Sequence, residues 1–227
     1  MRLFLVRHGH PDYRNDCLTE LGHLQAEAVG ERLKDEKIDK IFSSPMGRAR
    51  QTAEYIAKHH NLEVINLDFM HEITWGPKGG TPNGAYNPWE VVTRRVNEGA
   101  PVINADWQTK GPLSDNLVCD IIDNIGAESD KWLADLGYVR EGDYYRVGDV
   151  KYDCVVVTSH GGSSCGFIAR LLNLPFSFMC ASIKISMTGI TVIEFSDEKG
   201  RLCSPVLTLS NDDSHARGLS IENKYEM

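Results

Sequence analysis

Long apolar runs are absent from this sequence. Every run in the 227 residues is well short of the ~18 consecutive apolar residues that a membrane span needs. The pattern of a secretory signal is missing too, because only four apolar residues separate Arg2 from Arg7. We therefore expect a cytoplasmic protein that does not bind membranes.

Cysteine clusters and an excess of basic residues are absent as well. The six cysteines are scattered without a CxxC pair, which indicates reduced, mostly buried thiols rather than a disulfide framework or a metal site. The chain carries 24 Lys and Arg against 32 Asp and Glu, a net charge of −8. This balance argues against a general nucleic-acid binder, although a local cationic pocket stays compatible with it.

The sequence does contain a regular alternation of strand and helix patterns. Strands are predicted at residues 2–7, 40–43, 62–67, 152–159 and 189–195. Helices are predicted at residues 18–36, 46–60 and 163–173, with Thr19 and Ser44 as N-caps and Pro45 in the first helical position. A last strand near 202–209 is predicted to form an antiparallel edge. The alternation indicates a three-layer α/β/α fold with a mainly parallel sheet.

This rhythm breaks between about residues 68 and 150. The segment is predicted to hold a loop, two helical patches and a hairpin, at residues 75–89, 89–98, 112–136 and 138–147. A long insertion between sheet strands is usually a cap rather than part of the core. We predict one domain, residues 1–227, in which the insertion shapes the mouth of a pocket. Its charged residues Lys78, Arg94 and Arg95 are expected mostly to face water.

Chemically active side chains follow the ends of the predicted strands. Arg7 and His8 follow the first strand, and Arg48 lies shortly after the second. Glu72 lies past the third strand, and His160 follows the valine-rich one. The carboxyl ends of parallel strands meet at one edge of a sheet, so these residues are expected to share a site. Arginine binds phosphate as a bidentate fork and neutral histidine can attack phosphorus, so the set fits phosphoryl transfer.

Four short strings carry these residues in a fixed order, each at a strand–helix junction: LVRHG (5–9), LTELGHLQA (18–26), SSPMGRARQTA (43–53) and TSHGG (158–162). Together they resemble the histidine phosphatase superfamily, in the branch with cofactor-dependent phosphoglycerate mutases and their phosphatase relatives. The resemblance covers the chain except the insertion. It implies that His8 becomes a phosphohistidine and that Arg7, Arg48 and His160 hold the phosphoryl oxygens. It also implies that Glu72 is the general acid and later the base for water.

Two departures from the family pattern bear on the reaction. After RHG the family often has an acidic residue, then Thr or Ser, and an Asn a few residues on. This chain has His10-Pro11, and its nearest Asn is Asn15, which we predict as a substrate contact. The mutases share an ERHYG-like segment where this chain has HEITWG (71–76). This difference favours hydrolysis of a small phosphomonoester, with a phosphoglycerate-type phosphomutase as the alternative.

Two further substrate contacts are predicted, at Gly161 and Trp75. Gly161 follows the second histidine, where the acid-phosphatase branch typically has Asp, and this supports Glu72 as the acid. The expected partner is a small phosphorylated metabolite, and we expect no metal and no cofactor. A homodimer is compatible with the sequence, which does not determine the oligomeric state.

Two other functions are less consistent with the sequence. GSSCG (162–166) formally fits the nucleophile elbow G-x-S-x-G, with Ser164 as nucleophile and Asp212 or Asp213 and His215 as partners. Ser164 lies too far beyond its strand for an elbow, and too few strands follow it for an α/β-hydrolase. A non-catalytic phosphate-binding protein is also disfavoured, because all of the chemical residues are present.

Overall fold

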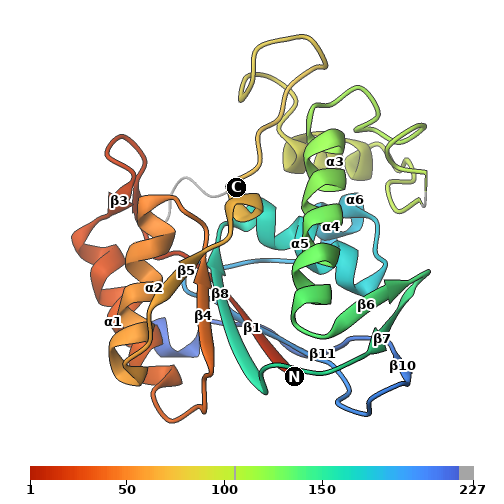
Figure 1. Ribbon diagram of the computed structural model, residues 1–227. Helices are drawn as coiled ribbons and strands as arrows, with labels where there is room; N and C mark the ends of the chain where they lie inside the picture. Colours follow the sequence, from red (N-terminus) through yellow and green to blue (C-terminus); the bar gives the residue numbers. More distant parts are fainter. Residues whose placement is uncertain (105, 220–227) are drawn as a thin grey trace.

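The computed structural model describes residues 1–104 and 106–219 and is built around a six-stranded sheet (Figure 1). In the order β11-β9-β1-β8-β4-β5, the sheet contains β1 (Arg2–Arg7), β4 (Lys40–Ser43), β5 (Val64–Asn66), β8 (Cys154–Ser159), β9 (Ile190–Glu194) and β11 (Val206–Asp212). The pairs β1/β8, β8/β4 and β4/β5 are parallel, which confirms the predicted α/β class. The edge strand β11 pairs antiparallel with β9, and β9 also pairs antiparallel with β1, which was not predicted.

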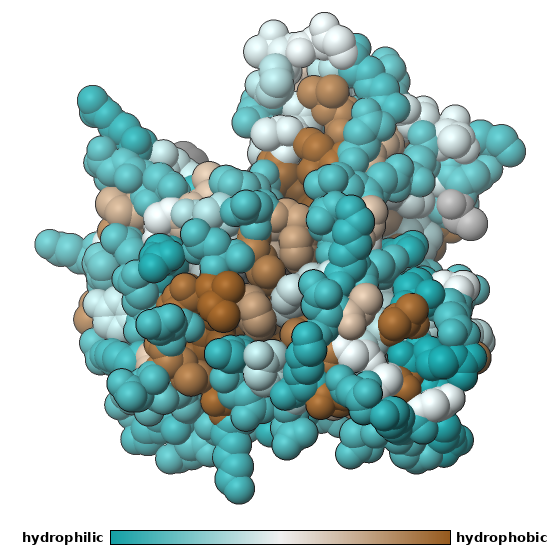
Figure 2. All heavy atoms as spheres, viewed as in Figure 1, coloured by the Kyte–Doolittle hydropathy of each residue, from teal (hydrophilic) through white to brown (hydrophobic). Residues whose placement is uncertain are grey.

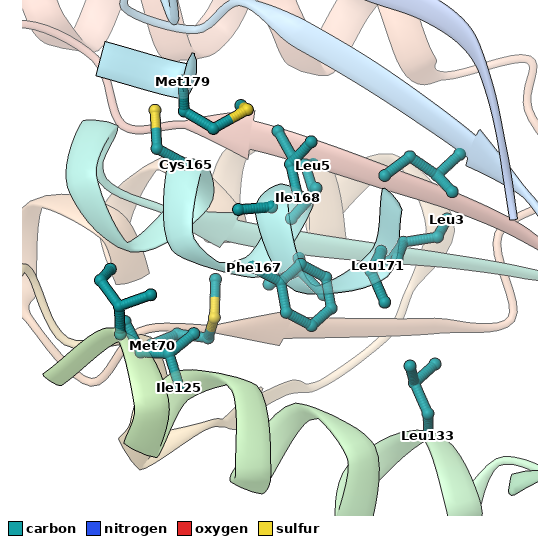
Figure 3. Close-up of a cluster of buried hydrophobic side chains, with 14 of the residues drawn as sticks. Leu3, Leu5, Met70, Ile125, Leu133, Cys165, Phe167, Ile168, Leu171 and Met179 are labelled. Carbon is teal, nitrogen blue, oxygen red and sulfur yellow. The ribbon is translucent and has the colours of Figure 1, made fainter. Parts of the chain in front are cut away.

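The two faces of the sheet bury separate sets of side chains. In β1, Leu3 and Leu5 belong to one core cluster while Phe4 and Val6 belong to the other, as the alternation of a strand requires. The helices α1 (Glu20–Leu33) and α2 (Gly47–His60) cover the second face, and α4 (Val118–Asp135) and α5 (Gly161–Leu172) cover the first (Figure 1). Figure 3 shows the first cluster, in which Phe167 of α5 lies between β1 and α4.

The helix starts match the sequence prediction in one case and not in the other. Thr19 caps α1, and its Oγ1 accepts a hydrogen bond from the Gly22 N–H at 3.1 Å. The prediction for α2 is wrong, because this helix begins at Gly47 and its N-cap residue makes no side-chain cap. The Gly47 N–H instead donates to Asp16 Oδ2 at 2.7 Å, so a distant loop supplies the cap.

The insertion divides into two parts with different roles. Residues 75–104 and 106–117 form loops around α3 (Pro88–Asn97) and stand above the carboxyl edge of the sheet (Figure 1), so this part is cap-like. The helix α4 lies in the layer that covers the sheet, with Ile125 and Leu133 in the core. It therefore belongs to the body of the fold, contrary to the expectation that the insertion stays outside the core.

The predicted hairpin and last strand meet in a second, smaller sheet. The hairpin is confirmed as β6 (Tyr138–Glu141) and β7 (Tyr144–Val147). The predicted strand 202–209 is divided between β10 (Leu202–Cys203), which pairs with β7, and β11 of the main sheet. Pro205 lies at the division, where its missing N–H cannot join a ladder.

The structure also contains elements that the sequence patterns did not predict: β2 (Pro11–Asp12), β3 (Cys17–Leu18), η1 (Asp68–Met70), α6 (Phe176–Ser182) and η2 (Ser214–Ala216). Each spans seven residues or fewer, too short for a clear periodic signal. Within the two described ranges, no helix has both the length and the apolar character required to cross a membrane.

Candidate active site

The register of the central strands brings the two predicted histidines together. Arg7 of β1 lies opposite Ser159 of β8, so His8 and His160 leave neighbouring parallel strands at the same level. The His8 N–H donates to the Ser159 carbonyl at 2.9 Å, which ties the two strand ends together. The ring centroids lie 5.0 Å apart at an interplanar angle of 62°, and both side chains are buried.

Burial and one hydrogen bond define the chemical state of His8. Its Nδ1 lies 2.7 Å from the Gly9 carbonyl oxygen, which can only accept, so Nδ1 carries the proton and Nε2 the lone pair. Burial lowers the pKa of His8 from 6.5 to about 3, with the charges of Arg7 and Arg48 acting in the same direction. At neutral pH, His8 is therefore uncharged, with a lone pair on Nε2.

His160 is held by a residue of the next strand end. Its Nε2 lies 2.8 Å from Ser44 Oγ, which also accepts a hydrogen bond from the Met46 N–H at 3.3 Å. The other ring nitrogen, Nδ1, is buried without a hydrogen-bond partner among the described residues. Burial, reinforced by the neighbouring His8 and Arg48, holds the pKa of His160 well below 6.5. His160 is thus neutral, with Nδ1 unsatisfied.

Arg48 connects the nucleophile to the loop between β2 and β3. Its Nε donates to His8 Nε2 at 3.3 Å and its Nη1 to Asp16 Oδ1 at 2.5 Å. The guanidinium also lies over the Tyr13 ring, 5.3 Å from the centroid. A ligand that bonds to His8 Nε2 would have to displace this contact from Arg48 Nε.

Arg7 is anchored from the segment that follows α6. Its Nη1 donates to the Ile185 carbonyl at 2.7 Å, while its Nε is buried without a partner among the described residues. Gly161, at the start of α5, packs beside this guanidinium. An anion placed between Arg7 Nε and His160 Nδ1 would relieve two costly unsatisfied groups.

Glu72 is fixed against the first turn of α5. Its Oε1 accepts hydrogen bonds from the N–H groups of Ile73, Gly162 and Ser163 at 2.9, 3.0 and 3.2 Å. A Cβ on Gly162 would lie 2.7 Å from this oxygen and clash with Ile73, so the contact requires glycine here. Desolvation raises the pKa of Glu72 despite the opposing hydrogen bonds, and this shift favours the protonated form that a proton donor needs.

A cavity of about 900 Å³ opens above these groups. Arg7, Glu72, Gly161 and Trp75 line it, whereas His8, Arg48 and His160 are buried and are not among the lining residues. The structure thus brings seven of the eight predicted site residues to one region.

Asn15 is the predicted site residue that the structure does not bring to the cavity. Its side chain is exposed and donates to Asp12 Oδ2 at 2.8 Å, and it is not among the residues that line the cavity. Sequence reasoning missed the next residue, Asp16, which binds Arg48, and it did not assign Ser44 to His160. An acidic residue shortly after RHG was the available signal for Asp16.

The alternative serine nucleophile has no triad in this structure. The Ser164 hydroxyl is buried and lies 2.8 Å from Ser159 Oγ. The Nε2 of His215 lies 3.2 Å from Thr188 Oγ1 instead. In the part of the chain that is described, no three His, Cys, Asp or Glu residues are grouped as a metal site would require.

Comparison with known proteins shows which family the chain resembles. The model of the histidine phosphatase superfamily (branch 1) matches residues 3–93, which include His8, Arg48 and Glu72. The solved phosphoserine phosphatase of Entamoeba histolytica, in complex with 3-phosphoglyceric acid, is 26% identical and matches over 94% of this chain and 98% of its own, with a TM-score of 0.62. The chain thus resembles the histidine phosphatase superfamily, and the family model covers its residues 3–93.

Other superfamily relatives include both mutases and phosphatases. A probable phosphoglycerate mutase of Photorhabdus laumondii is 36% identical over 85 residues, which are 34% of this chain and 40% of the relative. An uncharacterized phosphatase of Bacillus subtilis is 36% identical over 87 residues, 34% of this chain and 45% of the relative. The chain thus matches less than half the length of these two curated relatives. A mycobacterial glucosyl-3-phosphoglycerate phosphatase is 25% identical with a TM-score of 0.60, over 92% of this chain and 98% of its own.

Proposed function

We propose that this protein is a member of the histidine phosphatase superfamily and hydrolyses a small phosphomonoester through a phosphohistidine at His8. The observation that carries the proposal is the neutral His8, whose Nε2 lone pair lies 3.3 Å from Arg48 Nε and whose ring centroid lies 5.0 Å from that of His160. The proposed reaction uses no metal or cofactor, because the two arginines supply the positive charge that phosphoryl transfer needs. The substrate is a small phosphorylated metabolite, and a cytoplasmic location stays a prediction.

In the first step, His8 Nε2 forms a bond to phosphorus while the bond from phosphorus to the ester oxygen breaks. Glu72 gives its proton to the leaving oxygen, so that an alcohol departs rather than an alkoxide. Arg7, Arg48 and His160 hold the three remaining phosphoryl oxygens. The hydrogen bond from Nδ1 to the Gly9 carbonyl strengthens as His8 becomes positively charged.

In the second step, water attacks phosphorus and the bond to Nε2 breaks. Glu72, now a carboxylate, accepts the proton of the water, and the lone pair returns to His8. Inorganic phosphate leaves, and the enzyme is restored with Glu72 protonated. One carboxyl group thus acts first as acid and then as base, at a position that three backbone N–H groups keep constant.

A phosphoglycerate-type mutase is the second candidate, because curated relatives carry that name. A mutase returns the phosphoryl group to a second hydroxyl of the bound product instead of passing it to water. The HEITWG segment around Glu72 differs from the ERHYG-like segment of mutases and supports hydrolysis. Phosphoryl transfer between hydroxyls, with little free phosphate, would establish the mutase instead.

The test is a screen of phosphorylated metabolites for phosphate release, with the His8→Ala variant alongside. We expect kcat to fall by at least about 10³-fold in this variant, because the nucleophile is lost. The matched control is His23→Ala, which removes a histidine that contacts Tyr55 at 3.2 Å. Wild-type protein labelled during turnover should carry acid-labile, alkali-stable phosphate. Unchanged turnover in His8→Ala would refute the proposed mechanism.

A further inference from the structure

The cavity is much larger than a phosphoryl group requires. Its volume of about 900 Å³ lies near the upper end of the range for sites that enclose a drug-sized ligand. Its walls come from the N-terminal region, with Tyr13, Leu21 and Gln25, and from the insertion, with Trp75 and Trp89. Figure 2 shows a notch in the surface between the lobe of α1 and α2 and the lobe that carries residues 75–87. The volume beyond the phosphoryl-binding end is available to the alcohol part of the substrate.

Trp75 lies on the leaving-group side of the cavity, three residues after the proposed acid Glu72. Its loop is fixed by several hydrogen bonds. The Trp75 carbonyl accepts from the Asn83 N–H at 2.7 Å, and the next residue, Gly76, is held by Asn116 Oδ1 at 3.3 Å. The indole is half-buried, so one part is supported by the protein while another part faces the cavity. Trp75 is therefore a preorganised apolar contact.

Trp89 forms a second aromatic contact from an independent support. It lies in the first turn of α3, where Asn87 Oδ1 accepts hydrogen bonds from the N–H groups of Trp89 and Glu90 at 3.0 and 3.5 Å. Its indole packs edge-to-face against Phe176 of α6, with the ring centroids 6.3 Å apart. This side chain is also half-buried and lines the cavity. The N-cap residue Asn87 and the ring of Phe176 thus hold Trp89 in place before any substrate binds.

The charges around the outer cavity do not form a second anion site. Apart from Arg7 and Glu72, the charged residues that line the cavity are the positive Lys184 and Arg217 and the negative Glu90 and Asp213. The two positive and two negative side chains leave no excess that would select a carboxylate. A leaving alcohol without charge therefore fits the outer cavity better than one that carries a carboxylate.

We propose that the outer cavity is a leaving-group subsite for an uncharged, flat, apolar alcohol, which Trp75 and Trp89 contact. This inference rests on the proposed phosphatase function and names the substrate class: phosphomonoesters of alcohols that carry an aromatic or heteroaromatic ring. Ring contacts of this kind contribute to binding through both buried area and aromatic geometry. Phosphoserine and 3-phosphoglycerate lack such a ring and leave most of the cavity unfilled.

The test compares two phosphate esters with the same type of leaving oxygen, 2-phenylethyl phosphate and ethyl phosphate. Both release a primary alcohol, so a difference in kcat/KM reports binding of the ring rather than leaving-group chemistry. We expect 2-phenylethyl phosphate to be preferred by at least about 10-fold. The Trp75→Ala variant should lower this preference, measured as the ratio of the two kcat/KM values, about 5-fold or more. Trp75→Phe should restore most of the preference.

The outcomes separate this inference from the proposed function. Equal kcat/KM values for the two esters, or a preference for 3-phosphoglycerate or phosphoserine over 2-phenylethyl phosphate, would overturn the subsite and leave the phosphatase intact. A preference that persists in both Trp75→Ala and Trp89→Ala would also overturn it. No phosphate release from either ester or from p-nitrophenyl phosphate would instead contradict the proposed function. Retention of inhibition by inorganic phosphate in Trp75→Ala would show that the phosphoryl-binding end is undamaged.

Discussion

The two ends of the cavity are built on different principles. At the phosphoryl-binding end, strand register places the functional residues: Arg7 lies opposite Ser159, so His8 and His160 follow at one level. At the outer end, Trp75 and Trp89 project from loop and helix-cap positions of the insertion. A shared sheet can therefore keep the chemistry constant while the insertion changes. Most of the groups proposed for the reaction therefore follow sheet strands, whereas Glu72, Trp75 and Trp89 lie in the insertion.

The electrostatics of the two regions differ in the same way. His8, Arg48 and His160 are buried, and this burial lowers the pKa values of both histidines. In the insertion, Lys78 and Asp120 are exposed and form an ion pair at 3.5 Å. Charges in a desolvated site act strongly, whereas exposed pairs contribute little. Mutations in the two regions should therefore differ greatly in effect.

After the loss of His8, the largest effect is expected from Glu72→Gln. Glutamine cannot donate an acidic proton to the leaving oxygen, so kcat for alkyl phosphates should fall about 10² to 10⁴-fold. The first step for p-nitrophenyl phosphate should lose less, because its leaving group is already acidic. Steady-state kinetics with both substrates, and a burst experiment for the first step, would measure this. An equal loss for the first step of both substrates would contradict the role of Glu72 as an acid.

The next effect concerns stability at low pH. His8 has a pKa of about 3 in the folded protein and about 6.5 in the unfolded chain, so between these pH values only the unfolded chain binds the proton. The free energy of unfolding should fall as the pH falls below 6.5, by about 2 kcal/mol at pH 5 for this one histidine.

Urea unfolding at pH 7 and pH 5 would measure this linkage. In His8→Asn the loss between the two pH values should be smaller by about 2 kcal/mol, while groups that do not contact His8 contribute equally to both proteins. The exposed insertion offers the contrast, since Lys78→Ala should leave the pH dependence unchanged. The same pH dependence in His8→Asn as in the wild type would show that His8 is not buried in its neutral form.

Asp16→Asn tests the link between Arg48 and the β2–β3 loop. The change removes the negative charge that accepts from Arg48 Nη1 at 2.5 Å and from the Gly47 N–H at 2.7 Å. We expect kcat/KM to fall about 10-fold, the size of a charge-assisted hydrogen bond. The adjacent Asn15→Ala is the matched control and should stay within about twofold. A larger loss in Asn15→Ala than in Asp16→Asn would reverse this assignment and restore the prediction from sequence.

The smallest effect is expected from Lys78→Ala in the insertion. Its ion pair with Asp120 is exposed, so the free energy of unfolding should change by less than about 1 kcal/mol. Phosphate release should stay within about twofold of the wild type. A tenfold loss in kcat/KM would show that Lys78 contacts substrate. It would also contradict the expected difference in mutational effect between the two regions.

Much of the phosphoryl-binding end could be predicted because it depends on local patterns. The valine-rich strand β8 is buried at every position, as a central parallel strand should be, and parallel ends converge without further information. The sequence alone therefore predicts that His8, Arg48 and His160 lie at one edge of the sheet. Thr19 was also predictable, because a side-chain cap acts on N–H groups within its own turn.

Contacts between segments without a periodic signal could not be predicted. Asp16 reaches Arg48 and Gly47 from a loop in which it adopts a positive φ of 50°, and no helix or strand pattern encodes that turn. The position of Asn15 depends on the same turn, which directs its amide to Asp12 instead. The packing of α4 against the sheet could not be predicted for a related reason. The helix pattern shows that α4 has an apolar face, but it does not show which surface that face covers.

The sequence by itself therefore determined the layered fold, the strand ends that carry the nucleophile, and the identity of the charged groups around it. Periodicity and local capping act over a few residues, and these features follow from them. Only the tertiary structure decided the proton position on His8, the Asp16 contact, the anchoring of Glu72 and the meeting of Trp75 with Trp89 in one cavity. Those features depend on burial and on distances of a few ångströms between segments far apart in the chain.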